Sequence, residues 1–133
     1  MTETVEERLD AVRERIERTA KRAGRDPNDV TLVAVSKNVD PVRIADAIDA
    51  GQRVFGENRA QELVAHAQAV AADHVEWHFI GRLQRNKVRA LTSIVTVWQS
   101  IDRAELVTEL AKHAPGARIL VQVNVGDEPQ KGG

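Results

Sequence analysis

One lysine stands where an amine could react with a carbonyl compound. Lys37 directly follows the apolar run 31–36, which is rich in β-branched residues and too short for a helix, so a buried parallel strand is predicted there. Alternation puts Val33, Val35 and Lys37 on one face of that strand. Partial desolvation at such a strand end favours the neutral amine that attack on an aldehyde requires. The residues alone leave two interpretations open, a Schiff-base lysine or a lysine whose ammonium simply reaches water.

Two further polar residues follow the next predicted strand, which covers residues 53–56. Glu57 and Asn58 could orient a polar ligand at that position, and the glycine that ends the strand would let a ligand or backbone approach closely. The alternative is that Asn58 caps the following helix, with Arg59 and Glu62 on the exposed helix face.

A histidine lies inside the third predicted strand, residues 77–81. His74 precedes His78 by four residues, but a strand would not align the two rings on one ion, so no metal site is predicted. On the residues alone, His78 is expected to be a buried histidine that is hydrogen-bonded to a neighbour.

The segment 82–89 carries four cations, yet a nucleic-acid partner is not predicted. Nineteen Lys plus Arg against twenty Asp plus Glu give a net charge of −1, so no global field attracts a polyanion. The chain has no tyrosine, and its two Trp and two Phe lie in apolar strand patterns, which leaves no stacking platform for bases. The cationic segment is predicted to be a solvated helix face.

The elements that must position these residues alternate between strand and helix patterns. The apolar spacing predicts a first helix over residues 5–23, capped by Thr2 or Thr4 and ended by Gly24. Asp40 and Asp102 are predicted to cap two later helices. The predicted helices then cover residues 41–50, 60–67, 83–90 and 102–110, and the predicted strands cover 31–36, 53–56, 77–81, 94–98 and 118–125.

This alternation predicts an α/β fold with a parallel sheet and right-handed crossovers. The sheet could be open and doubly wound or could belong to a (β/α) barrel. The first strand-to-helix loop lacks the glycine-rich phosphate-binding motifs of open sheets, which favours the barrel. In both folds ligands bind at the loops that follow the strands, where Lys37, Asn58 and Gly81 lie.

Four segments together resemble the YggS/PROSC family, the pyridoxal phosphate homeostasis proteins. They occur in the family's order and spacing across nearly the whole chain, at residues 32–37, 55–62, 77–87 and 122–124. The resemblance implies a fold similar to the N-terminal domain of alanine racemase, a type III (β/α)8 TIM barrel. In that barrel pyridoxal 5′-phosphate (PLP) is held on a lysine at the end of the first strand. Lys37 occupies the matching place.

The resemblance implies PLP as cofactor and small-molecule partner, bound to Lys37 as a covalent aldimine, with Asn58, His78 and Gly81 around or close to the cofactor. It also implies a carrier or regulator of PLP, with no turnover reaction assigned. One alternative is an alanine-racemase-like racemase, which needs a second acid–base group opposite Lys37, and no tyrosine exists for that role. Another is a noncatalytic barrel fragment that assembles with a second chain.

The strand count departs from the family. Five predicted strands correspond to a partial barrel, so residues 1–133 are expected to form the N-terminal portion of an eight-stranded one. The remaining part supplies, in the family, the phosphate-binding loops and an arginine facing the pyridine nitrogen. Weak PLP binding and self-association through the open edges are therefore expected.

A cytoplasmic protein is the default expectation. The chain has no cysteine, which excludes disulfides, thiolate metal sites and cysteine nucleophiles. The first residues are acidic and polar, unlike a secretory signal, and no apolar stretch approaches the length that spans a membrane. No membrane partner is expected.

Overall fold

The computed structural model describes residues 2–133 and contains a parallel five-stranded sheet in the order β1-β2-β3-β4-β5. The predicted α/β alternation is confirmed. The strands are β1 (Ala34–Val35), β2 (Val54–Glu57), β3 (Glu76–Phe79), β4 (Val95–Ile101) and β5 (Arg118–Val121). The α-helices are α1 (Val5–Arg22), α2 (Pro41–Asp49), α3 (Ala60–Val70), α4 (Val88–Leu91) and α5 (Ala104–His113), and the 3₁₀ turns are η1 (Pro27–Asp29) and η2 (Arg85–Lys87).

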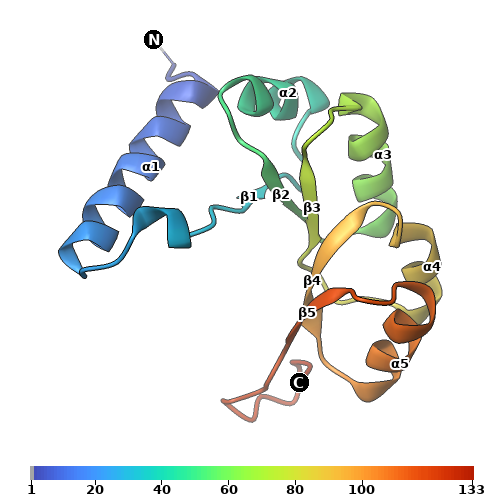
Figure 1. Cartoon of the computed structure of the whole chain (residues 1–133). Coiled ribbons are helices and arrows are strands. Elements are labelled where there is room, and N and C mark those ends of the chain that lie inside the picture. Colours follow the sequence, from blue (N-terminus) through green and yellow to red (C-terminus); the bar gives the residue numbers. More distant parts are fainter. Residues whose placement is uncertain (1) are drawn as a thin grey trace.

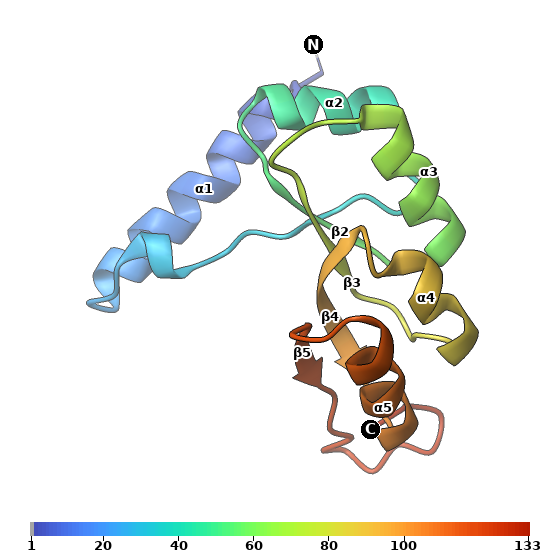
Figure 2. The same cartoon turned by 45° about the vertical axis from the view of Figure 1, so that its right-hand side comes forward.

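Helices cover one face of the sheet. Figures 1 and 2 show α2 to α5 following one another along the same side of the strands, as right-handed crossovers require. Helix α1 extends beyond the β1 edge and is attached through α2, where Arg13 donates from Nη1 to the Ala50 carbonyl at 2.8 Å. The opposite sheet face carries Val35, Gly56 and His78, and we call it the helix-free face.

The apolar core lies between the sheet and helices α2 to α5. Alternation along the strands sends the large aromatic side chains to this side, where Phe55 and Trp77 pair with ring centroids 5.5 Å apart. Phe79 and Trp98 form a second pair at 6.4 Å. The helix-free face is not sealed in the same way, because Val35 is 51% exposed.

Two predicted helix starts are confirmed in atomic detail. Thr4 and Glu7 form a reciprocal capping box at the start of α1. Asp40 accepts the Val42 N–H at 2.8 Å, and Pro41 occupies the first turn of α2. Gly24 follows α1 with φ +69°, a conformation that glycine adopts at little cost.

The two outer strands are shorter and more exposed than the sequence predicts. The predicted buried strand over 31–36 reduces to β1, and the strand over 118–125 reduces to β5. Both lie at the edge of the sheet and pair with one neighbouring strand only. Their other edge has no strand beside it to cover their apolar side chains. Val123 and Val125, beyond β5, are 69% and 94% exposed.

Two predicted helix starts are wrong. The predicted helix over 83–90 begins only at η2, because Leu83 is buried in an extended segment whose carbonyl accepts Arg103 Nη2 at 2.6 Å. Asp102 does not cap α5, which begins after Arg103 without a side-chain cap. The Asp102 side chain is buried and accepts Arg103 Nη1 at 2.7 Å, with Arg82 Nε at 3.6 Å.

Candidate functional site

The predicted site residues lie at or near the carboxyl ends of β1, β2 and β3. The register pairs Val35 with Gly56 and Gly56 with His78. Beyond these paired residues β2 and β3 stay connected, because the Ile80 N–H donates to the Glu57 carbonyl at 2.8 Å. Lys37 and Asn58 therefore follow neighbouring strands at one level, and His78 lies one side-chain layer below them.

Lys37 lies in the turn after β1. Its side chain is exposed, so the desolvation expected at a buried strand end is not provided by residues 2–133. The physical reason is that β1 is an edge strand and the helix-free face beside it is open. Within the same described residues Lys37 forms no salt bridge, which leaves its amine free of a competing carboxylate.

A buried polar network lies directly beneath this turn. Glu57 is fully buried, and its Oε1 accepts the Ser36 hydroxyl at 2.6 Å. The same oxygen lies 2.5 Å from Nδ1 of His66, a buried residue on α3. The second oxygen, Oε2, is buried without a hydrogen-bond partner in the described part of the chain. Glu57 therefore faces the helices and not a ligand space on the other side of the sheet, contrary to the sequence-based suggestion that it orients a ligand.

A second carboxylate ties the other side of the turn to the same helix. Glu62 Oε1 on α3 accepts the backbone N–H of Asn38, which has φ +59°. Ligand atoms of Glu57, Glu62 and His66 all lie within 4.8 Å of one another, the spacing of a metal site. One oxygen of each carboxylate, however, already accepts hydrogen bonds: Glu57 Oε1 pairs with Ser36 and His66, and Glu62 Oε1 accepts the Asn38 N–H. Hydrogen bonding accounts for this cluster, and we assign no metal to it.

Asn58 and Gly81 lie against each other. A Cβ placed on Gly81 would come 2.5 Å from the Asn58 carbonyl oxygen and 2.8 Å from its Cα. The loops after β2 and β3 thus touch at a point where only glycine fits. Asn58 does not cap α3, since Arg59 occupies the N-cap position without a side-chain hydrogen bond.

His78 is a buried histidine with one satisfied ring nitrogen. Its Nδ1 lies 2.9 Å from Gln99 Nε2, which fits the expected bond to a neighbour. Its Nε2 has no hydrogen-bond partner among the described residues and lies 3.8 Å from a Glu76 carboxylate oxygen. Burial lowers the pKa of His78 below its ordinary value; the charge of Arg118 acts in the same direction, and Glu76 opposes both.

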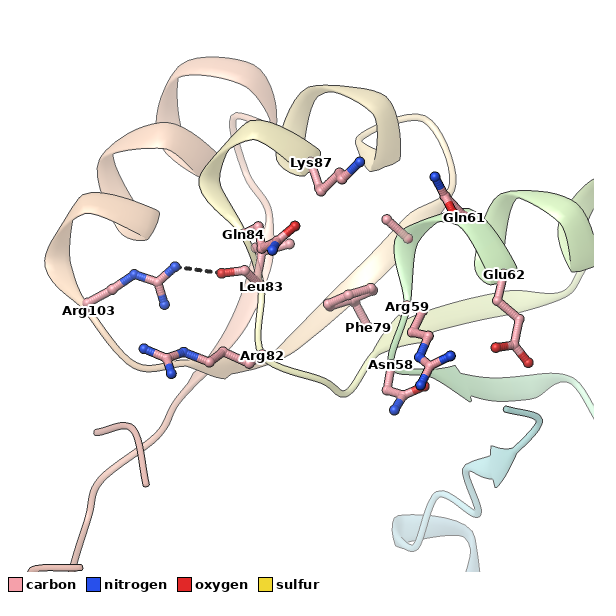
Figure 3. A pocket seen from close by; sticks show the side chains of 11 residues that line it. Asn58, Arg59, Gln61, Glu62, Phe79, Arg82, Leu83, Gln84, Lys87 and Arg103 are labelled. Atoms are coloured by element: carbon pink, nitrogen blue, oxygen red, sulfur yellow. Dashed lines mark hydrogen bonds between the residues drawn. The ribbon is translucent and has the colours of Figure 1, made fainter. Parts of the chain in front are cut away.

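A cavity of about 820 Å³ opens between the loops after β2 and β3 and the first turn of α3. Figure 3 shows Asn58, Phe79 and Glu62 around it, with cationic side chains from the loop after β3 and from the residues that immediately precede α3, α4 and α5. The cationic residues of its lining are Arg59, Arg82, Lys87 and Arg103. Part of the segment predicted as a solvated helix face therefore lines a cavity.

Known proteins resemble the chain along nearly its whole length. No family model matches it. Pyridoxal phosphate homeostasis proteins of Aquifex aeolicus and Escherichia coli K12 are 44% and 42% identical to it over 131 and 132 residues. The chain is homologous to these proteins. The alignments cover 96% and 94% of this chain and 58% and 56% of the relatives, so the chain spans a little over half of their length.

Solved structures of homologues share the fold. The structure of PipY from Synechococcus elongatus, solved with PLP bound, matches 88% of this chain with a TM-score of 0.72 and 34% identity. A protein of unknown function from Bifidobacterium adolescentis matches 97% of it with a TM-score of 0.85 and 32% identity. The matches cover 57% and 58% of those chains, which is consistent with the predicted partial barrel.

The sequence did not reveal the residues that hold the Lys37 turn. Glu57, Glu62 and His66 were available in principle, because the first ends a run that alternation places toward the core and the other two are four residues apart on one helix. What the sequence lacks is the packing of α3 against β2, which brings the three together.

Among residues 2–133, none of the helices has the length and apolar character that crossing a membrane requires.

Proposed function

We propose that this chain binds PLP and serves PLP homeostasis, with Lys37 holding the cofactor as a Schiff base. The observation that carries the proposal is the place of Lys37, an exposed amine without a salt bridge in the described chain, at the carboxyl end of a parallel strand. The names of the homologues and the PLP in the PipY structure support it. We also propose that the protein acts in the cytoplasm.

The residues around Lys37 fit part of what PLP requires. Asn58 offers an amide at the same level, and the Nε2 of His78, buried without a partner in the described residues, lies one layer below on the same sheet face. We propose that Asn58, His78 and Gly81 surround or support the cofactor ring. Gly81 would act indirectly, since its contact with Asn58 fixes where the amide lies.

We propose that Lys37 supplies the anchor, and we assign no phosphate-binding group among residues 2–133. The phosphate-binding loops and the arginine expected from the family have no counterpart assigned among these residues. We therefore propose that binding by this chain depends mainly on the reversible bond to Lys37, with modest affinity. PLP contributes a reactive aldehyde, and the chain contributes the amine and its surroundings.

The test is to identify the lysine that reacts. The protein is mixed with PLP, the imine absorbance is recorded, and borohydride reduction followed by peptide mass spectrometry locates the label among the five lysines. We expect the label mainly at Lys37 and a loss of most absorbance in Lys37→Ala. Lys112→Ala is the matched control, an exposed lysine on α5 outside the salt bridges of the described chain. Equal absorbance in Lys37→Ala and the parent would refute the assignment.

The racemase alternative is separated by a second measurement. A racemase exchanges the α-hydrogen of an amino acid with solvent, whereas a carrier need not do so. We expect no PLP-dependent deuterium incorporation into a panel of amino acids in D₂O. Exchange that disappears in Lys37→Ala would replace the carrier proposal with an enzymatic one.

A further inference from the structure

The turn that carries Lys37 is fastened on both sides by different carboxylates. Before the lysine, the Ser36 hydroxyl donates to Glu57 at 2.6 Å. After it, the Asn38 N–H donates to Glu62 on α3. Two backbone hydrogen bonds add to these. The Ser36 N–H donates to the Gly56 carbonyl at 3.0 Å, and the Val39 N–H donates to the Ser36 carbonyl at 3.1 Å. A lysine with an exposed side chain is thus held at a fixed backbone position.

The buried half of this arrangement, Glu57 and His66, costs desolvation free energy that an apolar pair of side chains would not. Glu57 is fully buried with one oxygen unpartnered in the described chain, and His66 beside it is 6% exposed. A buried carboxylate needs hydrogen bonds or an opposite charge to offset the loss of water, and apolar replacements of buried ionic groups are often at least as stable. The bonds that Glu57 does make lead to the residue before Lys37 and to α3.

The outer half holds a conformation that the chain would not readily keep by itself. Asn38 has φ +59°, in the left-handed region that asparagine tolerates better than most residues other than glycine. The direction of the chain after Lys37 depends on this residue. Glu62 accepts its N–H and so opposes a return to ordinary backbone angles.

We propose that Glu57 and Glu62, with His66 supporting Glu57, are positioning residues that fix the Lys37 turn so that its amine is presented to a carbonyl ligand. The inference rests on the proposed function. None of the three is required to touch the cofactor. They act through Ser36 and Asn38, and their effect is on how fast and how selectively Lys37 reacts, because a pre-oriented amine reaches the attack geometry more often.

Glu62 gives the sharper experiment because it is only partly buried and its truncation leaves no core cavity. Glu62→Ala removes the acceptor for Asn38, and Glu62→Gln keeps an oxygen at the same place. Ser36→Ala tests the inner bond by deleting the hydroxyl that Glu57 accepts. Each variant is exposed briefly to PLP and then to borohydride, and the label at Lys37 and Lys112 is measured by mass spectrometry.

The readout does not depend on any turnover. The neutral Lys37 Nζ bonds to the aldehyde carbon, the aldehyde oxygen leaves as water with both protons of the amine, and borohydride delivers hydride to the carbon of the resulting C=N bond while solvent protonates the nitrogen, which leaves a stable secondary amine. We expect the ratio of label at Lys37 to label at Lys112 to fall about fivefold or more in Glu62→Ala and in Ser36→Ala. In Glu62→Gln the ratio should stay within about twofold of the parent, since the hydrogen bond is retained.

The two proposals fail in different ways. If the parent protein does not label Lys37 in preference to Lys112, the proposed function fails. If the parent does so and Glu62→Ala and Ser36→Ala keep the same ratio, the positioning inference fails alone. A general loss of folding is recognised by thermal unfolding of each variant, and it would not be rescued specifically by Glu62→Gln.

Discussion

At the scale of single residues, the contact between Gly81 and Asn58 is the tightest constraint at the candidate site. A Cβ at position 81 would meet backbone atoms of Asn58 at 2.5 and 2.8 Å, and backbone cannot move aside cheaply. We predict that Gly81→Ala lowers the free energy of unfolding by about 1–3 kcal/mol, the usual cost of overpacking. Denaturant unfolding measures this directly.

Gly126→Ala is the matched control for that substitution. A Cβ there meets only the Glu128 side chain, at 3.4 Å or more, so its effect should stay within about 0.5 kcal/mol. Equal stability of Gly81→Ala and Gly126→Ala would show that the loops after β2 and β3 do not approach as closely as described. The loss of Lys37 labelling in Gly81→Ala alone would link this contact to PLP binding.

His78 is predicted to make stability depend on pH. Burial lowers its folded-state pKa below the unfolded value of about 6.5, so the unfolded chain takes up a proton first as the pH falls. The contribution is complete above that pH and is lost as the pH falls below it. We expect the free energy of unfolding to decrease between pH 7.5 and 5.5, with a slope from this group of at most about 1.4 kcal/mol per pH unit.

His78→Gln isolates this effect from the other histidines. A glutamine can still pair with Gln99 but does not titrate, so the difference between the two pH profiles reports His78. Glu76 and Arg118 remain in both proteins. Parallel profiles would contradict the prediction.

Single residues differ in how far their roles can be predicted from sequence. Lys37 could be singled out because a lysine after an apolar run is unusual in an arginine-rich chain, and the structure places it at the predicted strand end. The direction of Glu57 was missed although alternation with Phe55 places it toward the core, and its partners depend on how α3 packs against β2. Asp102 was assigned as a cap from its spacing, but ion pairs with Arg103 and Arg82 hold it elsewhere.

At the scale of elements, helix α2 links the Lys37 turn to the core. It begins three residues after Asn38, and its Ile44 is 1% exposed against the sheet. We predict that Asp40→Ala destabilises the protein by about 1 kcal/mol, because the Val42 N–H loses its acceptor. Asp46→Ala, at an exposed position in the middle of the same helix, should change stability by less than about 0.5 kcal/mol. Thermal unfolding of both variants measures the loss of stability. A loss of the same size in Asp40→Ala and Asp46→Ala would argue against the cap.

Element types were predictable and element ends were less so. Apolar spacing located the long helices of the described residues, and the predicted caps, Thr2 or Thr4 for α1 and Asp40 for α2, include the two that the structure uses, Thr4 and Asp40. The outer strands were overestimated because an apolar run does not reveal whether a second neighbour exists to pair with it. The start of α4 depends on a tertiary bond from Arg103 to Leu83, which no local pattern records.

At the scale of the whole molecule, the sheet order follows the chain order without interruption. This is the arrangement that strand–helix alternation predicts and that the solved homologues share over 88–97% of this chain. The sequence could also indicate that five strands are fewer than a closed barrel needs. The physical consequence is that β1 and β5 each present an unpaired edge, and the face between them remains uncovered by helices in the described chain.

The exposed edge at β5 is predicted to drive self-association. Val121 and Val123 are 67% and 69% exposed at the end of an edge strand that pairs with one neighbour, a combination that favours pairing with a second copy. We expect light scattering to report a mass that rises above that of the monomer with concentration. The double substitution Val121→Lys and Val123→Lys should restore the monomer, because charges on an edge oppose strand pairing.

Val42→Lys, at a position 68% exposed on α2, adds a charge away from the edge and should leave the association unchanged. A parent protein that stays monomeric at every concentration would mean that this edge is protected within the chain itself.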